Sequence, residues 1–182
     1  MKNELSFISE EIINLQGLLM FTACHNKISI LPNNFFRLQH LTSICLHGNK
    51  LTALSDDIGN LSNLTSITIS NNDIEVLPQS ISKLEHLDSL DIENTQISEI
   101  PMELLRHKSL NKLSINDNLL QFVVENIQYL DINTINLTAS DFQESSKIVQ
   151  DLNFRLDTEI WVEDRDKKDN GCIQLSKYKD KK

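Results

Sequence analysis

The chain has 182 residues and a formal net charge of −9, which disfavours binding to nucleic acid or to an anionic membrane, since both need a basic protein face. No segment approaches the roughly 20 apolar residues of a membrane span, and no long apolar run of a signal peptide follows Met1. The three cysteines lack the spacing of a disulfide framework, which predicts free thiols in a reducing compartment. We therefore expect a cytoplasmic protein, or one that is secreted without a signal peptide.

A 23-residue repeat organises the chain from its first residues to residue 139. Residues 1–14 carry the second half of one repeat, as a partial repeat or N-terminal cap, and residues 15–139 hold five regular repeats and one irregular repeat. Eight positions recur, seven apolar and one asparagine, and only Thr95 and His107 depart from this rule in the regular repeats. In the third regular repeat these positions are Leu61, Leu64, Ile67, Ile69, Asn72, Ile74, Leu77 and Ile81.

Written out, the repeat is LxxLxxLxLxxNxLxxLPxxIxx, with proline at Pro32, Pro78 and Pro101 and with Ser55 in its place in the second repeat. This pattern resembles the leucine-rich-repeat family over residues 3–139. The resemblance implies an α/β solenoid with a short, curved parallel sheet on its concave side. Turns and 3₁₀ segments would form the convex side.

The residues support the same architecture independently. Ile67, Thr68 and Ile69 alternate apolar and polar side chains, which predicts a short strand with one buried face. Because all repeats run in the same direction, each strand pairs with its counterpart in the next repeat in a parallel manner. The return segment is short and is interrupted by Pro78, so we expect a turn or a 3₁₀ piece there.

The asparagine that follows each strand predicts a structural ladder. A buried amide side chain both donates and accepts hydrogen bonds, so it satisfies backbone groups where the chain turns inward. Thr95 offers a single donor, which predicts that the fourth rung is the weakest. The expected ladder consists of Asn26, Asn49, Asn72 and Asn118.

Residues 140–182 break the repeat and predict a C-terminal α+β cap with a basic tail. Residues 140–143 have the pattern of a capping box before an amphipathic helix that extends to residue 156. Residues 158–162 and 172–175 predict two strands of a hairpin. We expect this segment to cover the end of the repeat core.

The polar strand positions form the expected binding face. The family resemblance implies that the concave face binds the partner, and the 23-residue spacing supplies its residues. Acidic side chains lie at its centre, which favours a protein partner with a basic or neutral surface. The predicted partner-binding residues are Cys45, His47, Thr68, Ser70, Asp91, Glu93, Lys112, Ser114 and Asn116.

Two more specific interpretations of this face, a zinc site and a catalytic pair, have less support. Cys24, Cys45 and His47 have zinc-ligand chemistry, but the sheet is open and their spacing matches no zinc finger. Cys24 beside His47 has the composition of a nucleophile–base pair, but Ser70 and Glu93 stand in the wrong order for a relay. We expect neither a metal nor a catalytic site.

The sequence therefore predicts a monomeric, non-enzymatic protein-interaction module without a cofactor. An alternative is the recognition part of a bacterial-type effector or regulator whose catalytic domain is absent from this chain. Neither hypothesis involves nucleic acid or a membrane.

Overall fold

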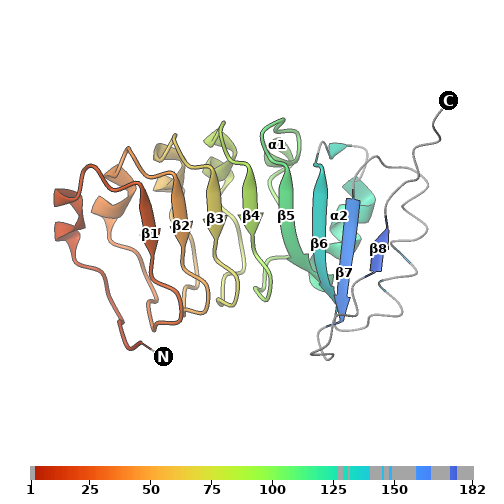
Figure 1. Ribbon diagram of the computed structural model, residues 1–182, viewed down its shortest axis with the longest axis horizontal. Coiled ribbons are helices and arrows are strands. Elements are labelled where there is room, and N and C mark those ends of the chain that lie inside the picture. Colours follow the sequence, from red (N-terminus) through yellow and green to blue (C-terminus); the bar gives the residue numbers. More distant parts are fainter. Residues whose placement is uncertain are drawn as a thin grey trace.

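The computed structural model describes residues 3–126, 129–130, 132–139, 145, 148, 159–164 and 173–175. Its strands lie side by side in chain order and form one sheet (Figure 1). The first seven strands are parallel, and the last pairs with its neighbour in the antiparallel direction. The strands are β1 (Met20–Thr22), β2 (Ser43–Cys45), β3 (Ser66–Thr68), β4 (Ser89–Asp91), β5 (Lys112–Asn116), β6 (Thr134–Ala139), β7 (Glu159–Asp164) and β8 (Ile173–Leu175).

The repeat length sets the register of the first five strands. Ile44 lies opposite Ile67, and Ile67 lies opposite Leu90, each 23 residues further along the chain. The next pairing is shorter by one residue, because Leu113 lies opposite Ile135 in the irregular sixth repeat. The inward-facing apolar side chains of β2 to β6 are at most 2% exposed, so the apolar columns form one continuous core.

Short helical turns occupy the return segments, as the interrupted pattern predicted. Successive turns contact one another beside the sheet, which makes a second layer (Figure 1). The elements are η1 (Glu10–Asn14), η2 (Asn33–Arg37), η3 (Asp56–Asn60), η4 (Gln79–Lys83), α1 (Met102–Leu105), η5 (Asp117–Leu119) and α2 (Leu120–Asn126). The returns after the fourth and fifth strands depart from the 3₁₀ geometry of η1 to η4: the first is the α-helical turn α1, and the second is the 3₁₀ turn η5 continued by the helix α2.

Serine and proline alternate as the residue that precedes the turns η1 to η4. Ser55 accepts a hydrogen bond at its Oγ atom from the N–H group of Asp57 (3.1 Å) and so caps η3. Pro32 cannot cap η2 with a side chain, and the Glu10 carboxylate does so from the neighbouring turn. It accepts from the N–H groups of Asn33 (3.2 Å) and Asn34 (2.9 Å).

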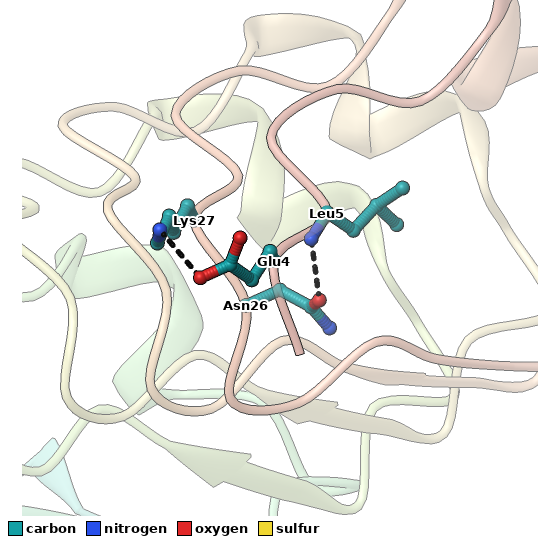
Figure 2. A network of polar contacts seen from close by, with 4 residues as sticks. All are labelled: Glu4, Leu5, Asn26 and Lys27. Atoms are coloured by element: carbon teal, nitrogen blue, oxygen red, sulfur yellow. Dashed lines mark hydrogen bonds and ion pairs between the residues drawn. The ribbon is translucent and has the colours of Figure 1, made fainter. Parts of the chain in front are cut away.

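Residues 3–14 continue the solenoid as the second half of a repeat. The N–H group of Leu5 donates to the Asn26 Oδ1 atom (3.0 Å), and Glu4 forms an ion pair with Lys27 (3.2 Å; Figure 2). The N–H group of Lys27 in turn donates to the Leu5 carbonyl (2.8 Å). The backbone bonds hold this segment in the repeat geometry, because an ion pair on an exposed surface contributes little.

The two tail strands lie close to their predicted positions. β7 pairs with β6 over six residues and continues the parallel sheet, while β8 pairs with β7 in the antiparallel direction. The helix expected over residues 140–156 lies mostly outside the described residues, as does the basic tail, so the capping role remains a prediction. No described helix has the length and hydrophobicity that crossing a membrane would require.

Candidate functional site

The outer face of the sheet, opposite the core, carries the polar strand columns, and we call it the concave face. The first two columns are in register: Ser43, Ser66, Ser89 and Lys112 align, as do Cys45, Thr68, Asp91 and Ser114. Neighbours in a column therefore lie one strand apart, about 4.8 Å. The third column contains His47, Ser70, Glu93 and Asn116, which lie at or just beyond the strand ends.

Exposure differs sharply within these columns. Lys112 is exposed, and most of the other predicted residues are half-buried. Ser70 is only 2% exposed, so its side chain lies below the surface of the face, and its contact with a partner remains a prediction. His47 and Asp91 flank it in the adjacent repeats, and its hydroxyl group contacts both of their side chains.

A hydrogen-bonded chain runs across three strands on this face. The Ser70 hydroxyl donates to the Asp91 Oδ2 atom (2.8 Å), and the His47 Nδ1 atom lies 2.9 Å from the Ser70 Oγ atom. Because Ser70 gives its single hydroxyl proton to Asp91, its contact with His47 is a hydrogen bond in the tautomer that carries the proton on Nδ1. The Asp91 Oδ1 atom accepts from the Glu93 N–H group (3.2 Å).

This order does not activate a nucleophile. In a catalytic relay the base lies between the nucleophile and the acid, whereas here the hydroxyl group lies between the imidazole and the carboxylate. The Ser70 proton already points to Asp91, so His47 cannot remove it. The chain instead holds three polar side chains in one arrangement, which makes the centre of the face rigid.

A column of left-handed backbone residues was missed by the sequence reasoning. His25, Gly48, Asn71 and Asn94 precede the ladder position in successive repeats, with φ angles of 56°, 68°, 55° and 50°. The composition of the column was an available signal, because glycine, asparagine and histidine tolerate this region better than other residues. A Cβ atom on Gly48 would lie 2.8 Å from the His25 Nδ1 atom, so glycine also leaves room for that ring.

The two cysteines near the first two strands are not the free thiols that the sequence led us to expect. Cys24 and Cys45 are joined by a disulfide, and their Cα atoms are 6.1 Å apart. The rings of His25 and His47 meet edge to face beside it, with centroids 4.7 Å apart. In this state neither sulfur is a thiolate ligand, and no group of three or more metal-binding side chains occurs within the described part of the chain.

The ladder asparagines bond both along and across the repeats. The Asn72 Oδ1 atom accepts from the Leu51 N–H group (2.9 Å), and its Nδ2 atom donates to the carbonyl groups of Leu46 (3.0 Å) and Ile69 (2.9 Å). Asn49 has the same arrangement one repeat earlier. Both side chains are buried, at 4% and 8% exposure, so they bridge backbone groups that water does not reach.

The later ladder positions bond differently. Thr95 is 3% exposed and donates to the Ile92 carbonyl group (2.7 Å). It leaves the Ile74 N–H group without the acceptor that asparagine supplies to Leu51. Asn118 is exposed and donates to the carbonyl group of Ile97 in the preceding repeat.

Comparison with known proteins connects this geometry to one family. Residues 39–97 match the sequence model of the leucine rich repeat family. A leucine-rich-repeat protein of Leptospira interrogans is 29% identical, with a TM-score of 0.65, and the match covers 72% of this chain and 35% of that chain. No curated protein sequence matches the chain.

Two further solved structures share the fold at lower identity. Internalin C2 of Listeria monocytogenes is 20% identical, with a TM-score of 0.59, over 74% of this chain and 59% of that chain. The ectodomain of the Arabidopsis thaliana receptor kinase GASSHO1/SCHENGEN3, in complex with CASPARIAN STRIP INTEGRITY FACTOR 2, is 24% identical, with a TM-score of 0.57. The match covers 75% of this chain and 17% of that chain. The chain thus spans about a third of the Leptospira protein's length and less of the receptor's.

Proposed function

The repeat region of this chain belongs to the leucine-rich-repeat family, and we propose that it is a non-enzymatic module that binds a protein partner on its concave face. The observation that carries the proposal is the hydrogen-bonded centre of that face. His47, Ser70 and Asp91 constrain one another across three strands. A surface that is ordered before binding loses little conformational entropy when a partner docks.

The charge of the face defines the kind of partner. Asp91 and Glu93 lie two positions apart on the same side of the chain, and Lys112 is the single lysine or arginine in the three columns. The chain carries eight acidic residues and one base between Asp73 and Glu103. This field favours a basic or neutral protein surface and accelerates its association.

The absence of catalysis is part of the proposal. The candidate nucleophile–base pair of Cys24 and His47 does not have its sulfur free, because Cys24 is bonded to Cys45. The Ser70 hydroxyl group is buried and donates to a carboxylate. Both groups therefore have a structural use that explains their presence.

Affinity capture from the native host with paired variants tests the proposed face. Ser66→Arg with Thr68→Arg places two bulky side chains on the concave face, where both residues are half-buried. Asp56→Arg with Glu85→Arg introduces the same residue type at exposed positions on the return side. The captured partner should be lost with the first pair and retained with the second, and both variants should unfold near the wild-type temperature.

The opposite pattern would move the binding face to the return side. A folded concave-face variant that retained the partner at wild-type affinity would end the proposal. The control pair adds more positive charge than the concave-face pair, because it also removes two carboxylates, so a loss of binding confined to the concave-face pair is not a general effect of added positive charge.

A further inference from the structure

A groove with a volume of about 330 Å³ lies away from the concave face, along the flank that leads from the ladder to the return segments. Its buried floor includes Ile100, and its walls include Val76, Met102 and Phe122. The carboxylates of Glu99 and Glu103 border it. The groove thus combines an apolar interior with two acidic groups.

The repeat and its irregularity together create this groove. Val76, Glu99 and Phe122 occupy one position in three successive repeats, 23 residues apart. The return segments at these repeats change from the 3₁₀ turn η4 to the α-helical turns α1 and α2. A 3₁₀ turn rises about 2.0 Å per residue and an α-helix about 1.5 Å, so the two cannot stack as evenly as identical turns.

The two carboxylates lack neutralising partners. Glu99 and Glu103 are exposed, and neither side chain has a hydrogen-bond or ion-pair partner among the residues that the structure describes. The nearest base in sequence, Arg106, lies instead over the ring of Tyr129, 5.0 Å from its centroid. A positive charge from another molecule would therefore meet two free carboxylates beside an apolar surface.

An apolar row extends the groove along the flank. Val76 is 71% exposed, and Ile30, at the equivalent position of the first repeat, is 72% exposed, with Ala53 exposed between them. Repeats follow one another at about the spacing of strands, 4.8 Å. An extended chain, unlike a small free amine, would cover both the groove and this row.

We infer that the groove and the row form a second docking surface, on the flank of the solenoid, for an extended segment of a partner protein. The basic side chain of the segment, lysine or arginine, enters the groove with its methylene stem against Val76, Met102 and Phe122. Its charged end meets Glu99 and Glu103. Apolar residues of the same segment cover the row toward Ile30.

Nuclear magnetic resonance titration of the methyl-labelled full chain tests this site with a blocked peptide of sequence Leu-Ala-Lys-Ala-Leu, in which both leucines lie on the same side of an extended chain as the lysine. The methyl signals of Val76, Ile100 and Met102 should shift and saturate. Glu99→Gln with Glu103→Gln should weaken binding by about fivefold, as expected for two surface charge pairs. Asp56→Asn with Glu85→Gln removes two exposed carboxylates that do not border the groove and should change affinity by less than about twofold.

Three further binding measurements can each support or contradict the proposal. Peptides with glutamate or norleucine in place of lysine should bind at least about fivefold more weakly, and equal binding would overturn the role of the charge. Free butylammonium should not saturate the site at concentrations where the peptide does, and equal affinity would overturn the assignment to a protein segment. Val76→Thr keeps the shape of the wall but should also lower the affinity for the peptide. An unchanged affinity would show that Val76 makes no apolar contact with the peptide.

Discussion

Asn72→Ala tests whether the asparagine ladder stabilises the repeats through backbone groups. The substitution removes the acceptor of the Leu51 N–H group and the donor to the Ile69 carbonyl group. The Leu46 carbonyl group keeps Asn49 as a donor (2.9 Å), and the Ser70 carbonyl group keeps the Gly48 N–H group (2.9 Å). Two backbone groups are therefore left unpaired.

The expected loss follows from those two groups. Each buried, unpaired group costs about 1–3 kcal/mol, so the free energy of unfolding should fall by about 3 kcal/mol. This is a large part of the 5–15 kcal/mol that is typical of a domain. Urea denaturation followed by circular dichroism measures the change, since a lower midpoint with an unchanged slope reports lost stability.

A matched asparagine provides the control. Asn63 is exposed and donates a single side-chain hydrogen bond to the Gln39 carbonyl group (2.7 Å), so Asn63→Ala should cost less than about 0.5 kcal/mol. Asn94 is a poor control, because its φ angle of 50° makes alanine costly there. Equal losses for Asn72→Ala and Asn63→Ala would refute the ladder argument.

Three other substitutions probe the turns and the tail. Thr95→Asn should stabilise the protein by about 1 kcal/mol, because the amide can accept from the Ile74 N–H group, and a lower urea midpoint would contradict this. Gly48→Ala should cost about 1–2 kcal/mol, because its φ angle is +68° and the new Cβ atom meets the His25 ring; an unchanged melting temperature would show that the turn relaxes freely. Ile160→Ala should cost about 2–4 kcal/mol, because Ile160 is 3% exposed in the shared core, whereas a wild-type midpoint in denaturation would show that β7 is not part of the cooperative unit.

Much of the architecture follows from the sequence because its signals are local and repeat. A fixed interval of 23 residues brings equivalent residues opposite one another, so the register of β1 to β5 follows directly from counting. Alternation around Ile67 assigns one side chain to the core and the next to the surface. The irregular pairing of Leu113 with Ile135 was visible as the one-residue loss of phase in the sixth repeat.

The sequence by itself thus determined the order of the strands, the parallel pairing, the core columns and the 3₁₀ returns. Tertiary structure alone decided how the polar side chains engage one another: Ser70 is buried between His47 and Asp91, and Cys24 is joined to Cys45. The physical reason is that the Ser70–Asp91 and Cys24–Cys45 contacts run diagonally between repeats, and a left-handed residue such as Gly48 redirects the chain just beyond each of β1 to β4. A pattern within one repeat indicates which way a side chain faces. The side chain that it contacts belongs to another repeat, and the distance between the two depends on the backbone conformation just beyond the strands.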